Sequence, residues 1–205
     1  MLTAFTAGLM LITISELGDK TFFIAVILSM RHSRKLVFIG VIAALAAMTI
    51  LSVMIGQLIA FLPKIYTHYA TIGLFTLFGI KLLYDASRMP AKTDGKVVEE
   101  AEKAIDVSEK NLKNSNTKLA ILLESFILTF LAEWGDRTQI ATVTLAASNN
   151  AVGVTVGSIV GHAICTIIAV LGGRLIAGRI SERMVTAIGG FLFLIFAIVA
   201  NFEKV

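Results

Sequence analysis

The chain has 205 residues, of which 57% are hydrophobic and 16% charged, and its formal net charge is +4. A soluble domain carries about 25% charged and about 45–50% apolar residues, so this composition excludes an ordinary soluble protein. The excess positive charge does not indicate nucleic-acid binding, because the basic residues cluster in short loops between apolar segments, as orientation signals of membrane proteins do. The single cysteine, Cys165, excludes an intrachain disulfide and a cysteine-rich metal site.

Long apolar stretches predict the helices. Stretches of about 18 or more apolar residues are typical of membrane-spanning helices. We expect an all-α membrane protein with six transmembrane helices, at about 2–30, 36–61, 66–86, 119–147, 151–172 and 184–202. The polar segment 87–118 fits either a short amphipathic helix or a disordered linker. The N-terminus has no basic region before its apolar run, so we expect it to be retained rather than cleaved as a signal peptide.

The distribution of Lys and Arg predicts the orientation. Thirteen of these residues lie in the first, third and fifth loops between the expected helices, whereas two lie on the opposite side. Basic residues accumulate in cytoplasmic loops. We therefore expect segment 87–118 in the cytoplasm and both termini outside, in a plasma or inner cell membrane.

The sequence contains an internal repeat. Adding 117 to a position in the first half gives its counterpart in the second half without a gap, and the matched pairs span three helices. They include Gly40 and Gly157, Ala46 and Ala163, Thr49 and Thr166, Gly56 and Gly173, and Gly73 and Gly190. We expect two three-helix repeats, 1–86 and 119–205, joined by the linker 87–118. Because three is odd, the second repeat is expected to be inverted, as in many secondary transporters.

An acidic motif occurs once in each repeat, about midway along the first and fourth expected helices. The two copies are Glu16-Leu17-Gly18-Asp19-Lys20-Thr21 and Glu133-Trp134-Gly135-Asp136-Arg137-Thr138. Carboxylates in the membrane are costly, so they are functional candidates by default. On a continuous helix the two acids and the basic residue of each copy share a face, which extends back to Thr13 and Thr129. Gly18 and Gly135 predict either close helix approach or a local break.

We interpret Glu16, Asp19, Glu133 and Asp136 as the ligands of one transported cation. With Lys20 and Arg137 they leave a net charge of −2, which one divalent cation or two protons would neutralise. Exchange between these two states is what a cation/proton antiporter requires. Oxygen ligands favour Mg²⁺, Ca²⁺ and Mn²⁺ over Zn²⁺ or Cu⁺.

Alternatives stay open at this point. The acids could be structural, with Glu16 and Lys20 forming a bridge within one helix, or they could line a divalent-cation channel. A scaffold that transports nothing is also possible, whereas an exporter of small metabolites fits the charge less well. Lys20 and Arg137 either hold the carboxylates in place or substitute for the cation.

Other candidate residues have weaker signals. Glu124 suggests an access route or an interfacial role, and Gln139 either an amide ligand or a packing residue. We expect His162 to be packed and hydrogen-bonded rather than a ligand or a proton carrier. Met48 and Cys165 are repeat partners, and we expect them to pack in the core, the alternative being that paired sulfur atoms favour Mn²⁺ over Ca²⁺. His32 and His68 are expected to be loop residues without partners. Gly153, Gly157 and Gly161 are spaced for helix packing. No nucleotide-binding or hydrolase motif occurs in a fitting context, so we expect no enzyme activity and no cofactor.

The doubled Glu-x-Gly-Asp-Lys/Arg-Thr motif resembles that of the calcium/cation antiporter type-2 group, over nearly the whole chain. This group includes eukaryotic Golgi Mn²⁺/Ca²⁺–proton exchangers and bacterial manganese exporters. The resemblance implies that Glu16, Asp19, Glu133 and Asp136 carry Mn²⁺ or Ca²⁺. It also implies export from the cytosol, while Thr21, Thr138 and the other motif residues support the site.

Overall fold

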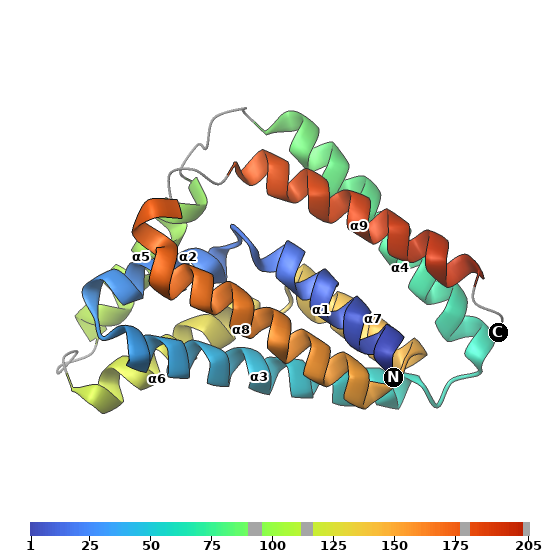
Figure 1. The fold of residues 1–205 in the computed structure, drawn as a ribbon, viewed down its shortest axis with the longest axis horizontal. Helices are drawn as coiled ribbons and strands as arrows, with labels where there is room; N and C mark the ends of the chain where they lie inside the picture. The colour runs from blue at the N-terminus through green and yellow to red at the C-terminus, as the bar shows by residue number, and fades with distance from the viewer. Residues whose placement is uncertain (90–95, 112–116, 177–180, 203–205) are drawn as a thin grey trace.

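The computed structural model describes residues 1–89, 96–111, 117–176 and 181–202, and every regular element in these ranges is an α-helix (Figure 1). In chain order the helices are α1 (Leu2–Glu16), α2 (Lys20–Arg31), α3 (Arg34–Ile59), α4 (Lys64–Arg88), α5 (Lys96–Asn111), α6 (Lys118–Glu133), α7 (Arg137–Ser148), α8 (Ala151–Ile176) and α9 (Glu182–Phe202). The prediction of an all-α protein is confirmed for this part of the chain.

Four helices, α3, α4, α8 and α9, are long and apolar enough to cross a membrane. They correspond within a few residues to the stretches expected at 36–61, 66–86, 151–172 and 184–202. Large apolar side chains on their outer faces are exposed, as lipid-facing residues are; examples are Ile80, Leu171, Ile195 and Ile198. The chain is therefore a multi-pass membrane protein.

The two stretches expected as continuous helices at 2–30 and 119–147 are each interrupted. α1 ends at Glu16 and α6 ends at Glu133, and each is followed by a short break before the next helix. Gly18 and Gly135 lie in the breaks with φ angles of 82° and 80°. Glycine is the residue that adopts this left-handed conformation without steric cost. Asp19 and Asp136 are the N-cap residues of the next helices, a position that Asp favours.

The break overturns one prediction. Glu16 and Asp19 do not lie on one face of a single helix, and neither do Glu133 and Asp136, because each pair spans the end of one helix and the start of another. The local break that the glycines allowed is the arrangement that the structure adopts.

The repeat is visible in the helix boundaries. Adding 117 to the bounds of α2 and α3 gives the bounds of α7 and α8 at both ends. Adding 117 to the last residue of α1 gives the last residue of α6, where the break begins. Packing follows the same shift. A Cβ on Gly157 would meet the backbone of Phe5 in α1, and a Cβ on Gly40 would lie 2.6 Å from the carbonyl oxygen of Leu122 in α6. Phe5 and Leu122 are themselves 117 positions apart.

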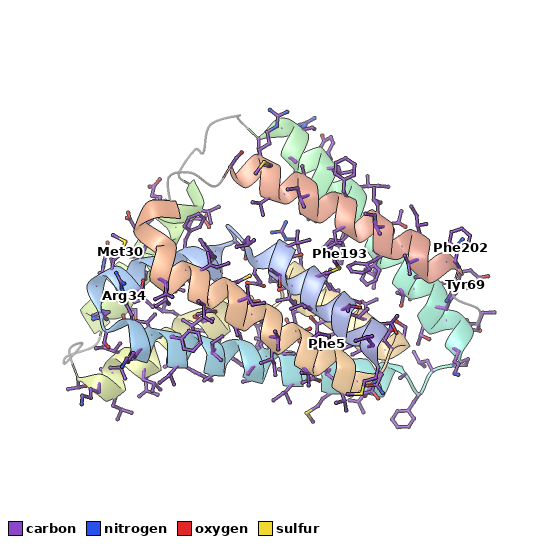
Figure 2. The ribbon with its side chains drawn as sticks, viewed as in Figure 1. Phe5, Met30, Arg34, Tyr69, Phe193 and Phe202 are labelled. Carbon is purple, nitrogen blue, oxygen red and sulfur yellow. The ribbon has the colours of Figure 1, made fainter. Side chains whose placement is uncertain are left out.

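Close contact between α1 and α8 depends on small residues. Gly153, Gly157 and Gly161 face the backbone of α1 at Met1, Phe5 and Leu9. Figure 2 shows Phe5 on α1 where the two helices run side by side. The prediction that these glycines serve helix packing is confirmed.

Helices α4 and α9 form a pair beside the other helices (Figure 1). Gly79 and Gly190 face one another at their contact. The pair packs against α7 and α1, which lie toward the end of the molecule that holds the N-terminus, called here the terminal end. Phe193 points from α9 toward α1 and stacks edge-on against Phe75 of α4 (Figure 2). Among the described residues, contact of the pair with α2 and α6 is at most marginal.

Helix α5 lies at the opposite end, called here the α5 end, and packs against α2. It is amphipathic: Ala101 and Ile105 are fully buried in the core cluster of α2, whereas Glu99, Glu100 and Glu102 face outward. Arg31 at the end of α2 pairs with Asp106 at 2.7 Å and with Glu109 at 3.0 Å. Of the two possibilities left open for segment 87–118, the amphipathic helix is present.

We predict that replacing Gly135 by Ala lowers the free energy of unfolding by about 1–2 kcal/mol, because alanine resists a positive φ. Apart from its chain neighbours, no atom of the described residues lies within 4 Å of the added Cβ, so the loss measures backbone strain. Gly73→Ala is the matched control, because Gly73 lies within a helix and its Cβ would also meet nothing within 4 Å. Thermal unfolding in detergent should show a loss for the first variant and none for the second. Equal melting temperatures would contradict the prediction.

Candidate functional site

Glu16 and Glu133 occupy equivalent positions at the last residues of α1 and α6. Each residue is only 2% exposed. The Thr21 hydroxyl donates to a Glu16 carboxylate oxygen at 3.0 Å, and the Thr138 hydroxyl donates to Glu133 at 3.1 Å. The predicted supporting threonines therefore hold the two acids in the same way, each from the start of the next helix.

The surroundings of these carboxylates favour a positive ion. The C-terminal end of a helix carries about half a negative charge, so each glutamate adds its charge to that of a helix end. Oε1 of Glu16 and Oε1 of Glu133 are buried and have no hydrogen-bond partner in the described part of the chain. Buried carboxylate oxygens without partners are costly unless a cation or a proton binds them.

Asp19 and Asp136 differ from the glutamates, because they begin helices. Oδ2 of Asp136 accepts from the backbone N–H of Thr138 at 3.2 Å. Arg137 donates to Asp19 at 3.3 Å, and its Nε lies 3.9 Å from Asp136. One guanidinium thus links the aspartates of the two repeats. The structure brings Asp19, Asp136 and Arg137 together, as the sequence predicted.

Lys20 does not follow its counterpart Arg137. Its side chain is 40% exposed, and its ammonium lies 3.8 Å from Glu100 on α5. The expectation that Lys20 shares a face with Glu16 and Asp19 is wrong, because the helix begins at Lys20 and turns this side chain toward α5. Of the two basic residues, Arg137 is the one beside the acids.

Gln139 joins the second break to α3. Its side-chain oxygen accepts from the N–H of Gly135 at 2.7 Å, and its amide nitrogen contacts the Met48 sulfur at 3.1 Å. Met48 and Cys165 are both buried, as expected, and the Cys165 thiol donates to the carbonyl oxygen of Thr13 at 3.3 Å. Gln139 therefore stabilises the break, a role not foreseen in the sequence.

A cavity of about 40 Å³ lies beside the first break. Asp19, Gly18 and Arg137 line one wall, and Val185, Thr186 and Gly189 of α9 line the other. Part of the acidic motif therefore lies next to the α4–α9 pair, across this cavity. No group of three His, Cys, Asp or Glu side chains within the described ranges is arranged to hold a metal ion as it stands.

Glu124 lies apart from this site. It is buried near the start of α6, about 13 Å along the helix axis from Glu133. Its nearest ionic neighbour is His32, at 3.9 Å, and His32 also lies 3.3 Å from Glu109 on α5. His32 is therefore not a loop residue without partners. The sequence missed this cluster because its members come from three separate helices and loops.

Comparison with known proteins places the chain in a family. Residues 4–90 and 121–205 match the family described as divalent cation/proton antiporter GDT1. The chain belongs to the GDT1 family. It is 60% identical to the GDT1-like protein sll0615 of Synechocystis sp., with all of both chains covered. It is 44% identical to GDT1-like protein 4 of Oryza sativa subsp. indica, covering 97% of this chain and 73% of that one. No solved structure matches the chain.

Family membership confirms the resemblance to the calcium/cation antiporters. The GDT1 family transports divalent cations, so the protein is a transporter rather than an enzyme, and the cation is its substrate. A chloroplastic relative, GDT1-like protein 2 of Oryza sativa subsp. japonica, is 42% identical over 98% of this chain and 61% of its own length. Both copies of the acidic motif lie within the matched residues.

We predict that Arg137→Gln destabilises the protein by about 1 kcal/mol, a modest value because the side chain is 37% exposed. The substitution leaves Asp19 and Asp136 without their shared positive partner. Lys20→Gln is the matched control, since Lys20 is the repeat counterpart and pairs only with an exposed residue of α5. Melting curves in low salt should separate the two variants. A larger loss for Lys20→Gln would contradict the assignment.

Proposed function

We propose that the protein exports a divalent cation, Mn²⁺ before Ca²⁺, from the cytosol in exchange for protons, with Glu16, Asp19, Glu133 and Asp136 as the ion-carrying residues. The observation that carries the proposal is a pair of buried glutamates at the ends of two interrupted helices, each beside a cavity that His162 also lines. Interrupted helices are where secondary transporters bind coupling ions, because helix ends and freed carbonyls face the ion.

The charges fit such an exchange. Four ionised acids with Arg137 beside them would carry a net charge of −3, because Lys20 pairs with Glu100 on α5 instead. A divalent cation would reduce this charge to −1, and so would two protons. The buried site cannot keep this charge uncompensated in either direction of transport. Binding of the metal and of protons is therefore mutually exclusive.

Two further features support six spans in inverted repeats. α1 begins at the terminal end and α6 begins at the α5 end, so the two half-helices approach the centre from opposite sides (Figure 1). The interrupted pairs α1–α2 and α6–α7 would each supply one span. With the four long helices this gives six spans, and the two breaks meet near the middle.

The position of the α4–α9 pair supports alternating access. It packs against α1 and α7, the half-helices toward the terminal end. The repeat relates these two half-helices to α6 and α2, at the α5 end. If the α4–α9 pair moved from α1 and α7 to α6 and α2, the α5 end would close and the terminal end would open. With the α5 end in the cytosol, as the basic residues predict, the described state faces inward.

Arg137 has a defined task in this cycle. It lies between Asp19 and Asp136, where its charge takes the place of a cation. Arginine stays protonated in proteins, so it is displaced from the aspartates rather than neutralised when the metal arrives.

The proposal predicts the behaviour of purified protein in liposomes. Wild-type protein should move Mn²⁺ inward or outward with a counterflow of protons, at a rate that saturates. The Glu16→Gln, Glu133→Gln double variant should lose at least about 90% of this flux, because amides cannot carry the compensating charge. Glu102→Gln is the matched control, since Glu102 is an exposed acid of α5.

Unchanged flux in the double variant would sink the proposal. Flux that is independent of the proton gradient and does not saturate would instead favour a channel. A scaffold predicts that the double variant fails to fold, so its melting curve, taken with Gly73→Ala as a folded reference, separates a structural role from transport.

A further inference from the structure

Two small cavities lie next to the two glutamates, each of about 10 Å³, roughly the space of one water molecule. One is lined by Glu16, Thr21 and residues of α8, and the other by Glu133, Thr138 and residues of α3. Glu16 and Thr21 are the repeat counterparts of Glu133 and Thr138. The two cavities therefore lie at equivalent positions in the two repeats.

Their linings differ in chemistry. The cavity at Glu16 has Phe22 and Ala25 where the cavity at Glu133 has Gln139 and Thr142. Met48 on the Glu133 side also stands where the repeat has Cys165. The two cavities therefore have equivalent backbone surroundings. At these two positions the cavity at Glu133 has side chains with oxygen or nitrogen atoms, whereas the cavity at Glu16 has apolar side chains.

His162 of α8 is the one residue shared by the linings of these two cavities in the part of the chain that the structure describes. It is 5% exposed, and its repeat counterpart is Leu45. Among the described residues its Nδ1 has no hydrogen-bond partner, and it lies 4.0 Å from Oε1 of Glu16, which has none there either. The hydrogen bond expected for a packed histidine is absent at this nitrogen.

The separation of these two atoms suits an ion between them. Two ligands on opposite sides of a small divalent cation, with bonds of about 2.1 Å, lie about 4.2 Å apart. An imidazole nitrogen facing a carboxylate at 4.0 Å is too far for a hydrogen bond and close to that spacing. The Met48 sulfur, buried on the Glu133 side, is a second donor that is not oxygen.

We propose that His162 and Met48 are specificity-determining residues, which add a nitrogen and a sulfur donor to the carboxylates and so favour a transition-metal dication over Ca²⁺ and Mg²⁺. Calcium and magnesium take oxygen ligands almost alone, whereas transition metals accept imidazole and sulfur. This inference rests on the proposed transport through the paired acids. It adds that the preference for Mn²⁺ comes from residues outside the acidic motif.

The test measures selectivity rather than activity alone. In proteoliposomes, kcat/KM is determined for Mn²⁺ and for Ca²⁺, and their ratio is compared between variants. His162→Leu, which installs the side chain of the repeat counterpart, should lower the Mn²⁺/Ca²⁺ ratio about tenfold, through a higher KM for Mn²⁺. Met48→Leu keeps the volume but removes the sulfur and should lower the ratio by less. Met54→Leu is the matched control, because this methionine of α3 is 61% exposed, and it should leave the ratio unchanged.

Pulsed electron paramagnetic resonance of Mn²⁺ bound to the wild-type protein in detergent gives a second readout that does not depend on any variant folding. A nitrogen-14 coupling from a directly bound imidazole is expected, and His162→Leu should abolish it. No such coupling in the wild type, or an unchanged ratio in His162→Leu, would overturn the inference. If the double glutamine variant has lost transport while the ratio is unchanged, the proposed function stands and this inference alone fails.

Discussion

The structure depends on placing a buried carboxylate at the end of an interrupted helix, twice. A helix C-terminus already carries a partial negative charge. Glu16 and Glu133 lie at such ends, where a further negative charge is unfavourable unless a positive ion is present. The surrounding features keep the acids there. The threonine hydroxyls fix their orientation, and the glycines allow the chain to turn without strain. The close packing of α1 on α8 and of α3 on α6 then holds the two half-helices rigidly around the centre.

The same break gives the two kinds of acid different environments. Each glutamate closes a helix and each aspartate opens the next one, where the N-terminal N–H groups favour a negative charge. Asp136 is stabilised without a cation by the N–H of Thr138, and Asp19 is stabilised by Arg137. Within the described ranges each glutamate accepts a hydrogen bond from one threonine hydroxyl, and its other oxygen has no partner. In the proposed site a cation would therefore gain most from the glutamates, while Asp19 and Asp136 are linked through Arg137.

Much of this arrangement could be predicted from the sequence, because apolar length and a gapless repeat are strong signals. They located the four long helices, paired Glu16 with Glu133, and related Gly40 to Gly157 before any packing was known. The breaks were harder to predict, since Leu17 and Trp134 keep the stretches apolar and one glycine does not end every helix. Contacts between distant segments were not predictable. Neither the turn of Lys20 toward Glu100 nor the approach of His32 to Glu109 and Glu124 leaves a local pattern in the chain.

In a carrier built from two equal halves, the inward-facing and outward-facing states are balanced in free energy. Differences between the halves change that balance. If the halves were identical, the inward-facing and outward-facing states would have equal free energies, and neither would trap the ion. A tenfold bias between them corresponds to only about 1.4 kcal/mol. In the described residues α5 docks on α2, through buried Ala101 and Ile105 and the pairs of Arg31, whereas α7, the repeat counterpart of α2, has no such helix docked on it. Surface ion pairs contribute at most about 1 kcal/mol each, yet that is the scale on which the two states of such a carrier are balanced. For the proposed carrier, the asymmetry of the scaffold is therefore sufficient to set which side the empty site faces, while the asymmetry of the cavities would act on its preference among ions.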